Sequence, residues 1–414
     1  MAILSVGWSC VFTVAVGMGL QTASKPPEFS VPPVPKLPTV PEYSVPPARP
    51  APTLPAENVS WIHRYKTKNV VLVMCDGLRW QEVFSGADAK LITKEQGVND
   101  VPAATAEYMR DTAEARREVL LPFLWGTIAK QGVLYGNRSK GSLSSVTNQY
   151  RVSYPGYTET LCGFAGKNIK DNRKIENPDV TVFEYLHGQT GFSGKVAAFT
   201  TWDVFSYIFN TQRCGFPVFA GVGPISFGIT NEAMRLWDVA RAETPCPWSG
   251  SCYDAASFRP ALEWIKLNTP RLVFLGLGET DEFAHEGKYR AYLDAARKFD
   301  RYVKDLWTTL QSMPQYKDST TLVLTCDHGR GGGIGSGAQL NQWRDHNDKT
   351  VGAEETWIIM IGPDTPALGE RTDGPAVTNS QIAATIATLL GAEYNKHQPR
   401  AGLPLIEAIK PASR

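Results

Sequence analysis

Continuous apolar runs that alternate with amphipathic stretches constrain the fold of this chain more than any other feature. Five such runs are bounded by polar residues or glycine, at 70–75, 195–200, 272–277, 321–326 and 357–361. Runs of this kind are typical of strands buried on both faces, as in parallel sheets. Helical amphipathic stretches lie between them, at 120–130, 181–187, 289–310 and 380–390. We expect an α/β domain over residues 61–414, with a mainly parallel central sheet flanked by helices.

The alternation breaks between residues 205 and 260, where the sequence is rich in aromatic residues and glycine. We expect this segment to form a small inserted cap over the functional edge of the sheet. Within it, Cys246 and Cys252 enclose the turn-forming sequence Pro-Trp-Ser-Gly-Ser. These two cysteines could close a disulfide in an oxidising compartment.

The N-terminal 60 residues have a composition of their own. An apolar run covers residues 3–20 and ends in small residues, which predicts a signal peptide or a signal anchor over 1–24. Residues 25–60 read as an extended linker, because 12 of the chain's 29 prolines lie between Pro26 and Pro55. We therefore expect an exported protein that is periplasmic, secreted or tethered to a membrane through its N-terminus.

The overall charge excludes one class of partner. Lys and Arg total 42 against 41 Asp and Glu, so the net charge is +1. A chain without a basic field is a poor candidate for dedicated nucleic-acid binding. The sequence does not indicate an oligomeric state.

Acidic residues follow three of the expected strands. Asp76 ends the first run, Asp281 comes just after the third, and Asp327 with His328 ends the fourth. Ligands bind beyond the carboxyl ends of strands in open α/β sheets. A single acid at a strand end is usually a helix cap or a turn former, but three of them beside histidines predict a functional site.

The spacing of these residues is typical of metal ligands. Asp281 and His285 are four residues apart and project from one face of a helical turn, as two ligands of one ion require. Asp327 and His328 could serve one metal or two neighbouring metals. His346 follows a glycine-rich loop that could bring it back to the site. Mixed carboxylate and imidazole donors suit Zn²⁺, with Mn²⁺ or Fe as alternatives.

A candidate nucleophile is Ser153, which precedes Tyr154 and Pro155 at the start of an expected short helix. The backbone N–H groups and the positive dipole end of such a helix favour an anionic phosphoryl group. The alternative role for Ser153 is that of a helix cap.

Together these motifs resemble the metal-binding core of the alkaline phosphatase superfamily, and most of all its nucleotide pyrophosphatase/phosphodiesterase branch. The resemblance extends over about residues 69–391 and includes the helical sequence at 382–391. It implies an alkaline-phosphatase-like fold and a pair of divalent metal ions.

The resemblance also implies roles for individual residues. Ser153 would be the nucleophile and form a covalent phosphoryl-enzyme, with a hydrogen bond to a phosphoryl oxygen from Asn172 or Asn177. The two implied metal sites comprise Asp281, His285 and His346 in one, and Asp76, Asp327 and His328 in the other.

Two departures from related patterns bear on the substrate. The branch usually has Thr before Phe-Pro, where this chain has Ser153 before Tyr154-Pro155. Formylglycine sulfatases need an Arg where this chain has Tyr157, which disfavours that enzyme class. We expect an exported hydrolase of a small-molecule phosphate ester, either a diester or a monoester. The alternatives are a sulfate- or phosphonate-ester hydrolase, a phosphomutase of the same superfamily, or a non-catalytic binding protein mounted on a stalk.

Overall fold

A computed structural model describes residues 65–332 and 337–410 of the chain. The expected signal segment and proline-rich linker lie outside the described residues. None of the helices in the described ranges is long and apolar enough to cross a bilayer.

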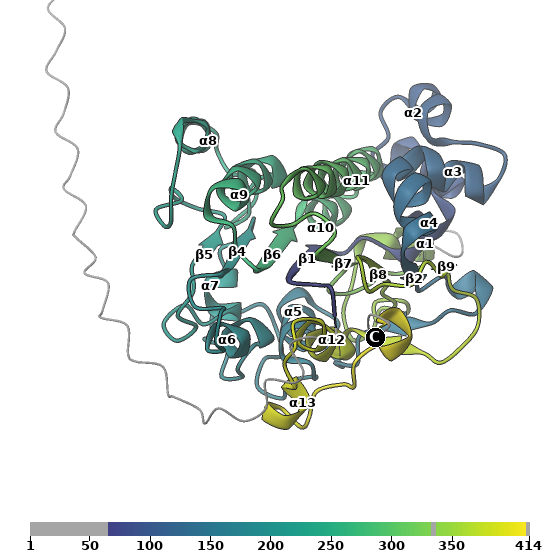
Figure 1. The fold of residues 1–414 in the computed structure, drawn as a ribbon. Helices are drawn as coiled ribbons and strands as arrows, with labels where there is room; N and C mark the ends of the chain where they lie inside the picture. The colour runs from purple at the N-terminus through teal and green to yellow at the C-terminus, as the bar shows by residue number, and fades with distance from the viewer. Residues whose placement is uncertain (1–64, 333–336, 411–414) are drawn as a thin grey trace, which may run out of the picture. The chain divides into compact units, whose positions relative to one another are not determined.

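The centre of the domain is an eight-stranded sheet with the order β5-β4-β6-β1-β7-β8-β2-β9 (Figure 1). The first five strands in this order run parallel, whereas β8 is antiparallel to both of its neighbours. The mainly parallel sheet expected from the sequence is therefore confirmed. The strands are β1 (Asn69–Cys75), β2 (Val133–Tyr135), β4 (Val196–Thr200), β5 (Val218–Ala220), β6 (Leu272–Leu277), β7 (Thr320–Thr325), β8 (Ile358–Ile361) and β9 (Gly369–Glu370). A separate two-stranded sheet pairs β3 (Ser144–Ser145) with β10 (Val377–Thr378).

The sheet is buried on both faces, which explains the continuous apolar runs. Along β1, Val71 and Val73 pack into one hydrophobic cluster, while Val70 and Leu72 pack into another on the opposite face. Each of the five expected strands agrees with an observed strand to within one residue at either end.

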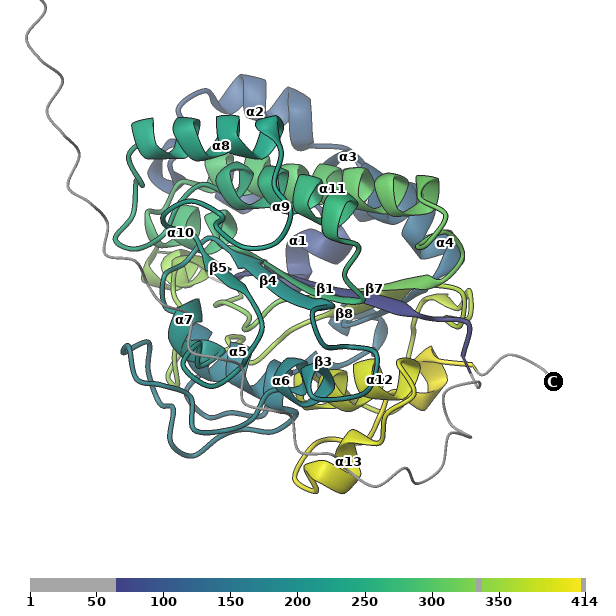
Figure 2. The ribbon, with the colours of Figure 1, turned by 60° about the vertical axis from the view of Figure 1, so that its left-hand side comes forward.

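Helices cover both faces of the sheet (Figure 2). One layer comprises α1 (Trp80–Ser85), α2 (Val101–Tyr108), α3 (Ala113–Leu120), α8 (Glu232–Glu243), α9 (Asp254–Asn268), α10 (Glu279–His285) and α11 (Tyr289–Ser312). The other comprises α5 (Ser153–Cys162), α6 (Val182–His187), α7 (Phe205–Ile208), α12 (Ile382–Leu389) and α13 (Tyr394–His397). Short helical turns complete the chain: η2 (Ala89–Leu91), η3 (Lys94–Gln96), η5 (Arg138–Lys140), η6 (Gly337–Arg344), η7 (Asn379–Gln381) and η8 (Ile406–Ala408).

One expected helix is interrupted. The stretch 120–130 contains the end of α3, a π-helix η4 (Leu124–Ile128) and a short α4 (Ala129–Gln131). The backbone N–H groups of Phe123 and Leu124 donate to the carboxylate of Asp300 at 2.9 and 2.8 Å. A side chain from a distant helix thus receives the free N–H groups at this helix start, where Pro122 also restricts the backbone.

The segment 205–260 differs from the expected cap insertion. It supplies β5, which extends the central sheet at its edge, and α8 and α9, which pack in the helical layer above it. The aromatic residues in this segment are therefore largely core residues of the same domain. The disulfide between Cys246 and Cys252 is present.

Candidate active site

Three neighbouring strands bring the predicted metal ligands together. Asp76 follows β1, Asp281 and His285 lie on α10 directly after β6, and Asp327 with His328 follows β7. Since β6, β1 and β7 are adjacent and parallel, their carboxyl ends meet at one edge of the sheet. The five side chains therefore converge there, as the position of ligand sites in open α/β sheets requires.

Ser153 is the first residue of α5, and its Oγ lies 3.3 Å from Nε2 of His328. The residue that precedes the helix is Val152, and no side-chain capping bond is present at this end of α5. Ser153 as a whole is 4% exposed, and it lines the same cavity as Asp76 and Asp281. Its position therefore differs from that of a helix cap.

Asp76, Asp327 and His328 form one candidate metal group. Nε2 of His328 lies 3.4 Å from Oδ1 of Asp76 and 3.2 Å from Oδ2 of Asp327. The other carboxylate oxygens have donors, because Oδ2 of Asp76 accepts from the Tyr157 hydroxyl at 3.0 Å and Oδ1 of Asp327 accepts from the Gly77 N–H at 3.1 Å. Oδ1 of Asp76 and Oδ2 of Asp327 are buried and have no hydrogen-bond donor.

The electrostatics of this group favour a cation. Burial raises the pKa of Asp327 to about 7. Burial and the neighbouring Asp327 carboxylate raise the pKa of Asp76. Two buried carboxylates that face each other need a positive charge or a proton between them. A divalent ion bound by these oxygens and by His328 would supply that charge.

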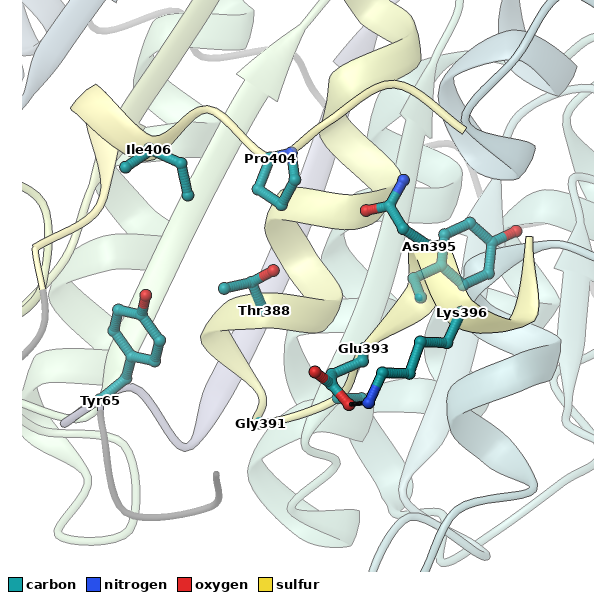
Figure 3. A pocket seen from close by; sticks show the side chains of 10 residues that line it. Tyr65, Thr388, Gly391, Glu393, Asn395, Lys396, Pro404 and Ile406 are labelled. Atoms are coloured by element: carbon teal, nitrogen blue, oxygen red, sulfur yellow. Dashed lines mark ion pairs between the residues drawn. The ribbon is translucent and has the colours of Figure 1, made fainter. Parts of the chain in front are cut away.

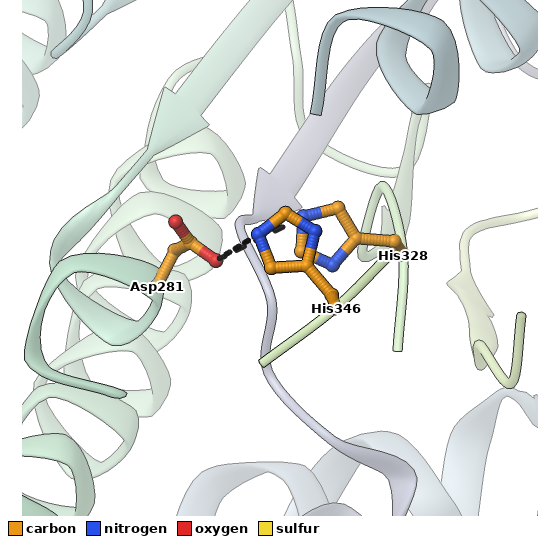
Figure 4. A group of neighbouring side chains, drawn as sticks. All are labelled: Asp281, His328 and His346. Atoms are coloured by element: carbon orange, nitrogen blue, oxygen red, sulfur yellow. Dashed lines mark ion pairs between the residues drawn. The ribbon is translucent and has the colours of Figure 1, made fainter. Parts of the chain in front are cut away.

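Asp281, His328 and His346 form a second candidate group, drawn in Figure 4. Nε2 of His346 lies 3.6 Å from Oδ1 of Asp281, and the rings of His328 and His346 stack with centroids 3.6 Å apart. His285 joins this group at its edge, with Nε2 3.0 Å from Nε2 of His346 and 3.1 Å from Oδ2 of Asp281. The structure thus brings all six predicted ligands together and places His328 within reach of both groups.

Backbone carbonyls orient two of the imidazoles. Nδ1 of His328 donates to the carbonyl of Gly329 at 2.9 Å, and Nδ1 of His346 donates to the carbonyl of Arg151 at 3.0 Å. In each ring this leaves the Nε2 lone pair directed at the site, which is the arrangement of metal-bound histidines. Burial lowers the pKa of both residues and favours the neutral form that binds a metal. The donor set and its free acceptors therefore fit divalent cations.

The loop before Ser153 is fixed by a buried carboxylate. Glu159 accepts hydrogen bonds from the backbone N–H groups of Thr147 and Asn148, at 2.7 and 2.8 Å. Asn148 in turn accepts from the Arg151 N–H at 2.8 Å. This chain of contacts sets the path of the backbone into α5 and the position of the carbonyl that binds His346.

Arg330 is a site residue that the sequence analysis missed. It is buried and forms an ion pair with Asp281, and its Nη2 also donates to the Asp281 carbonyl at 3.1 Å. Its position directly after Asp-His-Gly could have indicated a role in the site. However, an arginine side chain in a glycine-rich loop is usually exposed to solvent.

The two predicted substrate-binding asparagines lie in different places. Oδ1 of Asn172 accepts from the Tyr154 N–H at 2.9 Å, and the residue lines the cavity that contains Ser153. Asn177 is fully buried, and its Nδ2 donates to the carbonyl of Ile208 at 3.0 Å. The structure brings Asn172 to the site and places Asn177 in the core.

The cavity beside Ser153 has a volume of about 190 Å³. Trp202, Phe205, Ser251 and Glu282 line it together with the predicted site residues. Burial raises the pKa of Glu282, whose carboxylate also contacts the Ser251 side chain. Because these walls come from three separate loops and helices, spacing in the sequence gave no sign of them.

A second cavity of about 310 Å³ lies near the C-terminus, between Tyr65, α12 and α13 (Figure 3). Glu393 and Lys396 form an ion pair at its edge. None of the described residues that line it belongs to the predicted site.

Comparison with known proteins identifies the family. Residues 99–390 match the family described as type I phosphodiesterase / nucleotide pyrophosphatase. The chain belongs to this family. The match covers α5, α10 and the segments that follow β6 and β7. It confirms the superfamily and the branch that the motifs resemble, and identifies the chain as a hydrolase. A search of curated proteins with the sequence found no match.

Solved structures share the fold of this family member. The lipoteichoic acid synthase LtaP from Listeria monocytogenes is similar with a TM-score of 0.51 and 11% identity, over 80% of this chain and 74% of that one. Ps i-CgsB in complex with k-i-k-neocarrahexaose has a TM-score of 0.51 and 16% identity, over 83% and 77% of the two chains.

Proposed function

We propose that this protein is an exported hydrolase of phosphate diesters or monoesters that uses Ser153 as its nucleophile and two divalent metal ions as cofactors. The observation that carries the proposal is the position of the Ser153 hydroxyl, 3.3 Å from Nε2 of His328, in a cavity that it shares with Asp76 and Asp281. A hydroxyl so close to both ligand groups can attack a phosphoryl group that is held between them.

Ser153 would act in two steps. Its Oγ bonds to phosphorus and its proton passes to solvent water, while the P–O bond to the leaving group breaks and the departing oxygen takes up a proton from water to leave as the alcohol. Water then cleaves the phosphoserine and regenerates the hydroxyl. The metal ions would polarise phosphoryl oxygens and lower the pKa of the attacking oxygen.

In this proposal, Asn172 helps to position the phosphoryl group of the substrate. Because its Oδ1 accepts the Tyr154 N–H, its Nδ2 is directed away from the helix and can donate to a phosphoryl oxygen in the cavity. The bond to Tyr154 also ties this asparagine to the residue that follows Ser153. Nucleophile and donor would therefore keep a fixed separation during the reaction.

The donor atoms support zinc as the proposed metal. Each group combines carboxylate oxygen with imidazole nitrogen, a set that suits Zn²⁺ best and accepts Mn²⁺. Export is supported by the apolar run at 3–20 and by the disulfide in the domain, since disulfides persist in oxidising compartments.

The test is a substrate panel on chelated and reloaded protein. 4-Nitrophenyl phosphate, bis(4-nitrophenyl) phosphate, 4-nitrophenyl phenylphosphonate and 4-nitrophenyl sulfate would be assayed with Zn²⁺ or Mn²⁺. We expect a phosphate ester to be hydrolysed fastest, and chelation to remove that activity. Faster hydrolysis of the sulfate or the phosphonate would favour the alternative hydrolase, and turnover that survives complete chelation would exclude the metal-dependent reaction.

A further inference from the structure

We propose that Arg330 acts as a counter-charge for Asp281 and thereby weakens the binding of a divalent cation to the second candidate metal group. Asp281 shares that group with His285 and His346. Arg330 is a positioning residue in this proposal, because it would act on the ion through the Asp281 carboxylate. The inference rests on the proposed function, since it concerns one of the two metal groups of the same site.

The guanidinium of Arg330 is buried and held directly against Asp281. Its Nη2 pairs with Oδ1 of Asp281 and donates to the backbone carbonyl of the same residue at 3.1 Å. Its Nη1 donates to the carbonyl of Arg344. On its other side it packs on Gly77, where a Cβ would lie only 2.7 Å from Nε of Arg330. These contacts leave the guanidinium a single position beside the carboxylate.

The backbone that carries Arg330 is anchored as well. The Gly331 N–H donates to the carbonyl of Asp345 at 3.2 Å, and Asp345 directly precedes His346. The Gly331 carbonyl accepts from Nη1 of Arg79 at 3.1 Å, and Arg79 is itself buried. The loop is therefore bonded to the segment that supplies a metal-ligand candidate, and the guanidinium is a built part of the site.

The two candidate metal groups differ in charge because of this arginine. The first contains the carboxylates of Asp76 and Asp327, and neither forms an ion pair with a Lys or Arg of the described ranges. The second contains one carboxylate, that of Asp281, and Arg330 pairs with it. Since imidazoles bind metals in their neutral form, the first group carries two negative charges and the second carries no net charge.

This difference affects the free energy of metal binding. In metal-free protein the guanidinium neutralises the buried Asp281 carboxylate, which would be costly to leave unpaired. When a divalent ion binds, Asp281 lies between the ion and Arg330, and the two positive charges repel each other across it. The second group should therefore bind its ion more weakly than the same ligands would without the guanidinium.

The experiment measures Zn²⁺ binding by the whole chain in the absence of substrate. Calorimetry with a competing chelator would give a Kd for each binding step, and the step lost in Asp281→Asn belongs to the second group. We expect Arg330→Gln to lower the Kd of this step by about tenfold or more, because the amide still donates to Asp281 but carries no charge. The Kd of the other step should change less.

Two further variants test whether charge is the cause. Arg330→Lys keeps the positive charge and should leave the Kd close to that of the wild type. Arg117→Gln is the matched control, because Arg117 is another buried guanidinium, pairs with Glu370 and does not line the cavity beside the site. An unchanged or higher Kd in Arg330→Gln would overturn the proposal, as would equal decreases in Arg330→Gln and Arg330→Lys.

Thermal unfolding provides a second measurement. Because a ligand stabilises the folded state according to its affinity, the increase in melting temperature on addition of Zn²⁺ should be larger in Arg330→Gln than in the wild type or Arg117→Gln. A form of Arg330→Gln that folds only with Zn²⁺ would also support the proposal, because the ion then replaces the lost counter-charge. A variant that stays unfolded with Zn²⁺ would assign Arg330 a structural role and contradict the proposal.

These measurements separate the inference from the hydrolase proposal, because neither uses a substrate. A Kd that depends on the charge at position 330, in a protein that cleaves no ester, would support the inference and contradict the proposed function. Metal-dependent hydrolysis with the same Zn²⁺ affinities in wild type and Arg330→Gln would support the proposed function and refute the inference.

Discussion

The backbone carbonyl of Arg151 accepts a hydrogen bond from Nδ1 of His346 at 3.0 Å. Arg151 has a positive φ of 54° and precedes the nucleophile candidate Ser153 by two residues. The same bend in the backbone therefore starts α5 and orients a metal-ligand candidate from a segment almost 200 residues away. The proposed nucleophile and a candidate metal ligand are therefore connected through one short backbone segment.

Metal content tests the ligand assignment. We expect close to two divalent ions per chain in protein purified with Zn²⁺, measured by mass spectrometry of the metals. Asp281→Asn should lower this number because it removes a carboxylate shared by His285 and His346. Asp305→Asn, which changes a carboxylate in a partly exposed pair with Arg259, should leave it unchanged. Full occupancy in Asp281→Asn would argue against its role as a ligand.

Replacement of Ser153, the proposed nucleophile, should affect the rate of hydrolysis far more than the stability of the fold. We expect Ser153→Ala to lower kcat by roughly 10³-fold or more, as loss of a nucleophile does in serine enzymes. The melting temperature should stay close to that of the wild type, because the hydroxyl makes no capping bond at the start of α5. A lower melting temperature with unchanged kcat would assign Ser153 a structural role.

The stability of metal-free protein should depend on the protonation of Asp327. Its pKa is about 7 in the folded state, against about 3.9 in an unfolded chain. Between these values the folded state binds more protons, so this residue makes stability fall as pH rises from about 4 to 7. In protein with bound Zn²⁺ the stability should not decrease in this way as pH rises, because the ion takes the place of the proton on Asp327.

Urea unfolding at pH 5 and pH 7.5 would measure the effect in chelated and Zn²⁺-loaded protein. In chelated Asp327→Asn, the free energy of unfolding should fall less between pH 5 and pH 7.5 than in the chelated wild type, because this carboxyl is absent. An identical pH slope in chelated wild type and Asp327→Asn would contradict the prediction.

The disulfide should support both the fold and the cavity wall. Replacing Cys246 and Cys252 by Ser should lower the free energy of unfolding by about 2 kcal/mol, because the bridge closes a short loop. Since Ser251 lines the cavity, KM should also rise. Denaturant titration and steady-state kinetics would measure the two effects, and an unchanged KM would show that Ser251 keeps its place without the bridge.

Export predicts the N-terminus of the mature protein. Material recovered outside the cytoplasm should lack residues 1 to about 24, and N-terminal sequencing would show this. Exported protein that begins at Ala2 would support a retained signal anchor.

The sequence predicted the central strands well because they are buried on both faces and therefore read as unbroken apolar runs. It missed β2, β5 and β9, which have only two or three residues each; β5 and β9 are the edge strands of the sheet. The break in the helical stretch 120–130 depends on Asp300, a residue almost 180 positions away. Such long-range contacts have no local signal.

In the site, too, some residues have a signal in the local sequence and others are placed only by long-range contacts. Five of the six metal-ligand candidates follow strands or lie on the helix directly after one, so their convergence could be inferred from spacing. The sixth, His346, follows a glycine-rich loop, and only the family resemblance indicated its place. Asn172 and Asn177 both lie in one polar segment, and only tertiary packing distinguishes the one in the cavity from the one in the core. Arg330 and Glu282 belong to the site through geometry that no motif describes.

The approach of α5 to the end of β7 limits how this enzyme can be altered. A side chain at Gly156 would overlap the carbonyl oxygen of Asp327, so the helix that carries Ser153 lies directly against the backbone of a ligand strand. A library aimed at new substrates should therefore keep Gly156 and the residues around it constant. Substitutions at Trp202, Ser251 and Glu282 would change the wall of the cavity and leave Ser153 and the candidate metal ligands in place.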